Sequence, residues 1–222
     1  MGNEYQPDEI EIPAGKAILQ GDLVIPAAAT GIVVFAHGSG SSRFSPRNRW
    51  MARQLSQSGL ATLLFDLLTA EEQVIDEQTR ELRFDIPLLS DRLGEAVDWV
   101  SGQTTTRHLA IGLFGASTGA AAALNAAADR PQVVRAVVSR GGRPDLAMNN
   151  LPRVQAPTLL IVGGLDHAVI EMNREAAAQL YGECRLEIVP GATHLFEEPG
   201  KLEEVAELAR NWFGRYLGEQ AA

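Results

Sequence analysis

Cysteine is almost absent from this chain of 222 residues, in which Cys184 stands alone. A single cysteine excludes an internal disulfide framework and a metal site built from thiolates. The four histidines, His37, His108, His167 and His194, stand far apart, and none shows the HExxH spacing of zinc-binding helices. We therefore expect no metal and no cofactor, with Cys184 as a small core residue at the start of a strand.

Basic charge is also in short supply. Lys and Arg number 19 against 28 Asp and Glu, which leaves a formal net charge of −9. Proteins that bind nucleic acid neutralise its phosphates with basic side chains, so this balance argues against a nucleic-acid partner. A composition of 45% hydrophobic and 21% charged residues is typical of a globular protein with a sizeable core.

Long apolar segments are missing as well. The stretch AAAALNAAA, residues 120–128, is an alanine-rich helix pattern and is too short to span a bilayer. The first ten residues, MGNEYQPDEI, lack the basic segment and apolar run of a signal peptide. The sequence thus predicts a cytoplasmic protein without a membrane partner, and it leaves the oligomeric state open.

What the chain does contain is a regular alternation of strand and helix patterns. Short apolar runs such as IVVFAH and TLLIVGG are typical of strands that are buried on both faces of a parallel sheet. The alternation predicts an α/β fold with a mainly parallel central sheet and helices on both faces. The expected strands are 32–37, 61–66, 109–114, 133–139, 158–162 and 185–189, and the expected helices are 46–58, 86–101, 118–129, 169–181 and 199–217.

Two segments depart from this alternation. Residues 9–13 and 16–25 are separated only by Ala14-Gly15, which predicts an antiparallel start to the sheet. Residues 69–84 are charged and lack a strand pattern, so we expect a surface loop or short helix there. Because no linker, repeat or change in composition interrupts the chain, a single domain over residues 1–222 is predicted.

Ser117 lies at the centre of a GASTG segment, residues 115–119, which matches the G-x-S-x-G pattern of a nucleophile elbow. An apolar run precedes the segment and a strong helix former follows it, as a strand-to-helix elbow requires. The flanking glycines allow the strand and the helix to approach closely. A glycine-rich turn with an incidental serine is the alternative, and the context makes it the weaker one.

A serine nucleophile needs a base, and the base needs an acid to orient it. Asp166 follows one predicted strand and His194 follows the next, in the chain order Ser, acid, His that this kind of fold uses. We therefore expect a triad of Ser117, Asp166 and His194. His167 is expected at the pocket rim, His108 is expected at the opposite end of the sheet, and Asp145 remains an alternative acid.

The oxyanion of an acyl-transfer intermediate needs two backbone donors. The Thr118 N–H follows the nucleophile directly and opens a helix, which makes it the first expected donor. The second is expected from the turn His37-Gly38-Ser39-Gly40, with the Ser39 N–H as the choice. An ordinary flexible turn is the alternative for this segment.

Four segments, HGSGSS, LFGASTGAAAAL, LLIVGGLD and PGATHLFEEP, together resemble the α/β-hydrolase superfamily and its small dienelactone-hydrolase-like branch. The branch includes domains that are joined to phosphoribosyltransferases. The resemblance covers about residues 15–217 and implies an eight-stranded, mainly parallel sheet with Ser117, Asp166 and His194 as nucleophile, acid and base. Dienelactone hydrolases use a cysteine nucleophile, whereas this chain has Ser117, and the serine favours an esterase mechanism. Members of the branch also tend to carry histidine where this chain has Phe44.

Several arginines fall near the predicted site. Arg140 and Arg143 lie in a glycine-rich segment at a strand end, where they would bind a carboxylate or phosphate on the substrate. Surface salt bridging in an acidic protein is the alternative, and it is preferred for Arg43, Arg47 and Arg83.

These residues predict a serine hydrolase that cleaves small carboxylic esters through an acyl-enzyme, with a small-molecule ester as its partner. The short chain leaves no room for a large lid domain, so an open, shallow site and short acyl groups are expected. A thioesterase or a small peptidase would use the same triad. A non-catalytic hydrolase-fold binding module is the third possibility.

Overall fold

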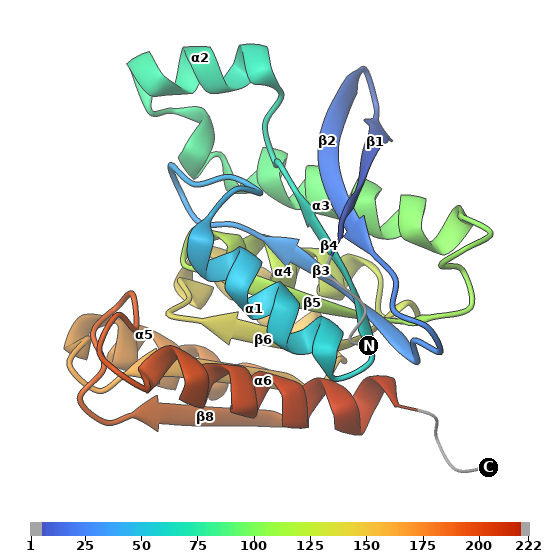
Figure 1. Ribbon diagram of the computed structural model, residues 1–222. Coiled ribbons are helices and arrows are strands. Elements are labelled where there is room, and N and C mark those ends of the chain that lie inside the picture. Colours follow the sequence, from blue (N-terminus) through green and yellow to red (C-terminus); the bar gives the residue numbers. More distant parts are fainter. Residues whose placement is uncertain (1–5, 219–222) are drawn as a thin grey trace.

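The computed structural model describes residues 6–218 (Figure 1). Residues 1–5 lie outside the described part, so the signal-peptide expectation for the first ten residues is not tested there. Eight strands form one sheet in the order β1-β2-β4-β3-β5-β6-β7-β8. The strands are β1 (Asp8–Ala14), β2 (Ala17–Val24), β3 (Gly31–Ala36), β4 (Leu60–Phe65), β5 (Ala110–Ala116), β6 (Val134–Arg140), β7 (Thr158–Gly163) and β8 (Cys184–Val189).

The sheet is parallel from β4 to β8 and antiparallel only at its start. The hairpin β1–β2 and the pair β2–β4 are antiparallel, and the other neighbouring pairs are parallel. This confirms the predicted antiparallel start and the mainly parallel sheet. Because parallel strands end at the same edge, the residues that follow β3, β5, β6, β7 and β8 gather there.

Helices cover both faces of the sheet, as the sequence predicts. Helices α1 and α6 pack on one face, and α3 and α4 pack on the other (Figure 1). No insertion within residues 6–218 forms a separate lid domain. The helices are α1 (Pro46–Gln57), α2 (Ala70–Thr79), α3 (Ile86–Gly102), α4 (Thr118–Asp129), α5 (His167–Ala177) and α6 (Lys201–Leu217), with 3-10 turns η1 (Leu82–Phe84) and η2 (Pro144–Arg153).

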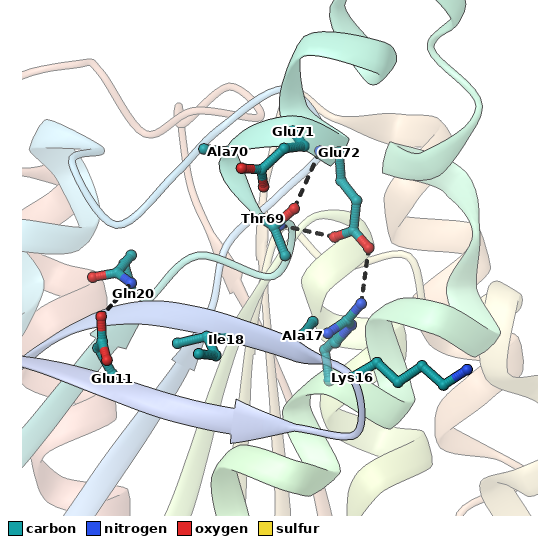
Figure 2. A pocket seen from close by; sticks show the side chains of 10 residues that line it. Glu11, Lys16, Ala17, Ile18, Gln20, Thr69, Ala70, Glu71 and Glu72 are labelled. Atoms are coloured by element: carbon teal, nitrogen blue, oxygen red, sulfur yellow. Dashed lines mark hydrogen bonds and ion pairs between the residues drawn. The ribbon is translucent and has the colours of Figure 1, made fainter.

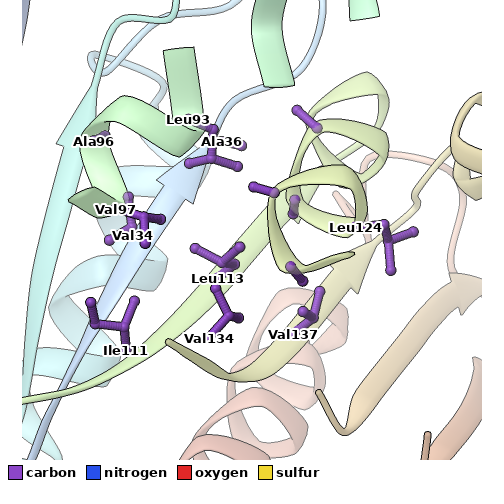
Figure 3. Packing of buried hydrophobic residues seen from close by; sticks show 14 of the residues in the cluster. Val34, Ala36, Leu93, Ala96, Val97, Ile111, Leu113, Leu124, Val134 and Val137 are labelled. Carbon is purple, nitrogen blue, oxygen red and sulfur yellow. The ribbon is translucent and has the colours of Figure 1, made fainter. Parts of the chain in front are cut away.

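The side chains of neighbouring residues in one strand pack into different hydrophobic cores, on opposite faces of the sheet. Val34 of β3 packs with Leu113 of β5 and Leu93 of α3 in the layer that Figure 3 shows. The next residue, Phe35, points to the other face, where its ring lies 4.9 Å from that of Phe114. Strand side chains alternate between faces, so continuous apolar runs are what a sheet covered on both sides requires.

The charged segment 69–84 forms a helix with a defined start. Thr69 and Glu72 make a capping box, in which each side chain accepts a hydrogen bond from the other residue's backbone N–H. Its apolar residues Val74 and Ile75 are 57% and 53% exposed, so burial does not create this helix. Periodicity alone therefore predicted only a surface loop or a short helix. The capping box explains why the segment forms a helix.

Most boundaries differ from the predicted ones by one or two residues, and two differences are larger. Helix α5 begins at His167 and ends at Ala177, earlier at both ends than the range 169–181. The 3-10 segment η2 was not predicted, because Pro144 and Pro152 remove backbone donors and break a helical pattern. None of the helices in residues 6–218 has an apolar stretch of the length that a bilayer span requires.

Candidate active site

Ser117 stands alone between the end of β5 and the start of α4. Its backbone has φ 51° and ψ −120°, a region that a residue with a Cβ rarely adopts. Two backbone hydrogen bonds hold this conformation: Ser117 N–H donates to the Arg140 carbonyl at 3.2 Å, and Arg143 N–H donates to the Ser117 carbonyl at 3.0 Å. The geometry is that of a strained strand-to-helix turn, which exposes the hydroxyl at the edge of the sheet.

The glycines on both sides of Ser117 are required by close packing. A Cβ at Gly119 would lie 2.2 Å from the Ala36 carbonyl oxygen, and one at Gly115 would lie 2.4 Å from Ala120 Cα. No side chain fits at these distances. The two glycines therefore let α4 begin directly against the ends of β3 and β5.

Asp166 and His194 come together from two adjacent turns. Asp166 follows β7 and His194 follows β8, and His194 Nδ1 lies 2.6 Å from Asp166 Oδ2. The imidazole packs against Gly141, where a Cβ would lie 3.5 Å from Nδ1. The alternative acid Asp145 is engaged elsewhere, because both its oxygens accept hydrogen bonds from Arg143 at 2.8 and 2.7 Å.

Ser117 and His194 line the same cavity, which has a volume of about 250 Å³. No hydrogen bond joins the Ser117 hydroxyl to His194 within the part of the chain that the structure describes. Nucleophile–base contacts often tighten only when substrate binds, so a shared cavity wall is compatible with a triad. Gly38, Ser39, Ser41, Ser45, Arg47, Asn48, Ala116, Arg140 and Leu195 complete the lining.

Two further histidines, His167 and His108, lie outside the cavity lining. His167 is the exposed first residue of α5 and is not part of the cavity lining. His108 is exposed just before β5 begins, at the opposite edge of the sheet from Ser117.

The turn after β3 is held by His37. The buried Nε2 of His37 accepts a hydrogen bond from the Leu67 N–H at 3.1 Å, so Nδ1 carries the proton and donates to the Gly38 carbonyl at 3.0 Å. Burial lowers the pKa of His37, which keeps the ring neutral. This role of His37 is not evident from the sequence, because Leu67 is far from His37 in the chain.

The same turn lies close to Ser117. A Cβ at Gly38 would lie 3.2 Å from Ser117 Cβ, and Ser39 lines the cavity. Thr118 is the first residue of α4, so its N–H has no carbonyl partner within the helix. Ser39 therefore shares the cavity with Ser117, and Thr118 directly follows Ser117 in the chain.

Two of the arginines near the site serve the surrounding scaffold. Arg83 donates from its backbone N–H and Nε to Asp76 at 2.9 and 2.7 Å, and its guanidinium lies against Gly40 of the turn. Arg43 binds Asp66 and Asp22. Exposed Phe44 lies beneath the guanidinium groups of Arg43 and Arg49, at 4.2 and 4.9 Å from its ring centre.

Arg140 and Arg143, which the sequence treats alike, have different surroundings. Arg143 is partly exposed, forms the ion pair with Asp145 and does not line the cavity. Arg140 is only 7% exposed and lines the cavity, and burial lowers its pKa to about 10, with a further contribution from Arg47. At neutral pH Arg140 therefore keeps its charge.

Metal and thiol chemistry find little support in the described residues. Within residues 6–218 no group of three or more His, Cys, Asp or Glu side chains could hold a metal ion. Cys184 begins β8, is half-buried and lies outside the cavity lining, and burial raises the pKa of its thiol to about 11. A raised pKa leaves very little reactive thiolate at neutral pH.

The eight-stranded sheet, the strained serine turn and the Asp–His pair define the chain as an α/β-hydrolase. The chain belongs to the dienelactone hydrolase family, which it matches over residues 19–217. A dienelactone hydrolase from Anabaena variabilis shares 60% identity, with a TM-score of 0.95 over 97% of this chain and all of that one.

One further solved structure supports the fold, and two curated relatives are named for another activity. A lidless α/β serine hydrolase from Xanthomonas campestris is 20% identical, with a TM-score of 0.77 over 97% of each chain, a likeness that shows the fold alone. Two Mycobacterium tuberculosis proteins with the provisional name phosphoribosyl transferase are 58% identical over 210 residues. These residues are 95% of this chain and 46% of theirs, so the chain spans about half their length.

Proposed function

We propose that this hydrolase is a serine hydrolase that cleaves small carboxylic esters through an acyl-enzyme intermediate. The observation that carries the proposal is the 2.6 Å contact between His194 Nδ1 and Asp166 Oδ2, beside a cavity that His194 shares with Ser117. A carboxylate that binds Nδ1–H leaves Nε2 as the basic atom of the ring. The strained turn at Ser117 presents the hydroxyl to that cavity.

In the proposed reaction, the Ser117 oxygen attacks the ester carbonyl carbon while His194 Nε2 accepts the hydroxyl proton. Asp166 holds the ring and stabilises its positive charge. The N–H groups of Ser39 and Thr118 donate to the oxyanion of the tetrahedral intermediate. His194 then gives the proton to the departing alcohol, and water, activated by the same imidazole, releases the acid and restores Ser117.

The choice of an ester rests on the nucleophile and on the family. A lactone is a cyclic ester, and the 60% identical relative is named a dienelactone hydrolase. The name of the Mycobacterium proteins describes chains of which this one covers only 46%, so it does not decide the chemistry of this segment.

Fluorophosphonate labelling tests the proposal, because the reagent modifies only activated serines. We expect labelling of the unchanged protein, loss of labelling in Ser117→Ala, and retention in the control Ser101→Ala, whose serine lies at the far end of α3. Hydrolysis of p-nitrophenyl acetate should be lost in parallel with the label. Labelling that persists in Ser117→Ala, or an unchanged protein that neither labels nor hydrolyses the ester, would refute the proposal.

A comparison of substrates distinguishes an esterase from a thioesterase or a peptidase. We expect the purified protein to have a larger kcat/KM for acetyl esters than for acyl thioesters or peptide amides. A larger kcat/KM for a thioester or an amide would reassign the substrate while keeping the triad.

A further inference from the structure

Arg140 is a buried cation without a protein partner. Arg140 is only 7% exposed, and its buried Nη1 has no hydrogen-bond partner. Within residues 6–218 its guanidinium forms no ion pair or hydrogen bond. A buried charge is costly unless it is paired. A guanidinium kept in this state, on the wall of the catalytic cavity, indicates a ligand that supplies the missing negative charge.

The neighbouring arginines make the contrast clear. Four other arginines near the site already bind a carboxylate: Arg43 binds Asp66, Arg47 binds Glu197, Arg83 binds Asp76 and Arg143 binds Asp145. Arg140 alone among these five faces the cavity without one.

The rest of the cavity wall is also rich in donors. Arg47 lines it and acts on Arg140 as a like charge, while no Asp or Glu is among the lining residues. Ser45 caps the N-terminus of α1, a 12-residue helix, and both Ser45 and Asn48 line the cavity. A helix N-terminus carries partial positive charge, which adds to that of Arg140, whereas Glu197 balances the charge of Arg47.

We propose that this cavity binds a phosphate group carried by the ester substrate, with the Arg140 guanidinium as its principal ligand. The inference rests on the proposed function and specifies its substrate class as small phosphorylated esters. A carboxylate offers two oxygens and one negative charge. A phosphate monoester offers three oxygens and two charges, which better matches a guanidinium, a second nearby arginine, an amide and a helix N-terminus.

The position of Arg140 also limits the size of the substrate. Arg140 pairs with Ala116 in the β5–β6 register, so it lies one strand across from the residue that precedes Ser117. A phosphate on Arg140 and an ester carbonyl at Ser117 must then belong to one compact molecule. The cavity volume of about 250 Å³ is in keeping with such a molecule.

A second cavity, of about 650 Å³, does not offer the same site (Figure 2). It lies between the β1–β2 hairpin and the start of α2, where Glu11, Glu71 and Glu72 contribute negative charge. Its arginine, Arg92, is already bound to Glu72 at 2.8 Å and to the Ala14 carbonyl at 3.2 Å.

Equilibrium binding on Ser117→Ala protein tests the inference without requiring catalysis. Isothermal titration calorimetry at about pH 8, where inorganic phosphate is dianionic, would compare phosphate with acetate. We expect phosphate to bind at least about tenfold more tightly than acetate. Arg140→Gln in the same background should weaken phosphate binding by about tenfold or more, whereas Arg174→Gln, on the exposed face of α5, should leave it unchanged.

Each outcome decides between the alternatives. Acetate binding as tight as phosphate, or phosphate binding that survives Arg140→Gln, would overturn the phosphate site. If Arg140→Gln fails to fold, which thermal unfolding would show, the phosphate-to-acetate ratio and a severalfold loss in Arg47→Gln decide in its place. Fluorophosphonate labelling of the unchanged protein reports separately on the nucleophile, so failure of the hydrolase proposal and failure of the phosphate site are distinguishable.

Discussion

His194 Nδ1 lies 2.6 Å from Asp166 Oδ2, although 28 positions separate the two residues in the chain. The contact arises because β7 and β8 are parallel neighbours, so the turns that follow them meet at one edge of the sheet. The pair orients the imidazole of the proposed base, and Gly141 leaves room for the ring beside it.

Replacing the acid tests that orientation. In Asp166→Asn the amide NH₂ can donate to Nδ1 and favour the wrong tautomer, so we expect kcat for p-nitrophenyl acetate to fall by about 10³–10⁴-fold. Asp145→Asn, at the alternative acid, should lose less than about tenfold. Steady-state kinetics on both variants decides the assignment, and the reverse order of effects would transfer the role to Asp145.

Acyl chain length is a second test, because the site lacks a lid domain within residues 6–218 and its cavity holds about 250 Å³. We expect kcat/KM to be highest for p-nitrophenyl acetate and butyrate and to decrease steadily as the acyl chain lengthens. The measurement is a series from acetate to palmitate below the micelle concentration of each ester. A maximum at palmitate would contradict the expectation.

Gly119→Ala should destabilise the whole domain. Its Cβ would lie 2.2 Å from the Ala36 carbonyl oxygen, so α4 must move away from β3, at a cost of about 2–4 kcal/mol in the free energy of unfolding. Gly214→Ala in α6 is the matched control. Beyond its chain neighbours and the backbone of its own helix, no atom lies within 4 Å of the added Cβ, and alanine should stabilise that helix by up to about 1 kcal/mol. Denaturant unfolding of both variants measures the difference, and equal effects would refute the packing explanation.

His37 predicts a pH dependence of stability. Because burial lowers its pKa in the folded state from the ordinary value of 6.5, the unfolded chain takes up this proton first as the pH falls. The free energy of unfolding should therefore decrease below pH 6.5, by up to about 1.4 kcal/mol per pH unit from this one group.

In His37→Gln that decrease should become shallower, although the variant is less stable at neutral pH because the Leu67 N–H and Gly38 carbonyl lose a partner. His108→Gln is the control, since its side chain is exposed at the opposite edge of the sheet. Denaturant unfolding between about pH 5 and 8 gives the slopes, and an unchanged slope in His37→Gln would contradict the prediction.

Much of this architecture was predictable because it follows from local patterns. Apolar runs such as residues 32–37 identified strands buried on both faces, and GASTG between a strand and a helix former identified the turn at Ser117. Asp166 and His194 were predictable from their order and from their places after successive strands. Helix α2 was less predictable, because its exposed Val74 and Ile75 lack amphipathic spacing. Its capping box marks only where the helix begins.

Local sequence patterns were enough to predict a mainly parallel sheet covered by helices and the three residues of the candidate triad, because periodicity and strand ends are properties of neighbouring residues. Only the tertiary structure separated Arg140 from Arg143, three positions apart in the same segment. Arg143 finds Asp145 close by and remains partly exposed, while Arg140 ends a buried strand and faces the cavity without a partner. Burial and pairing depend on which distant elements pack together, and no local pattern records that.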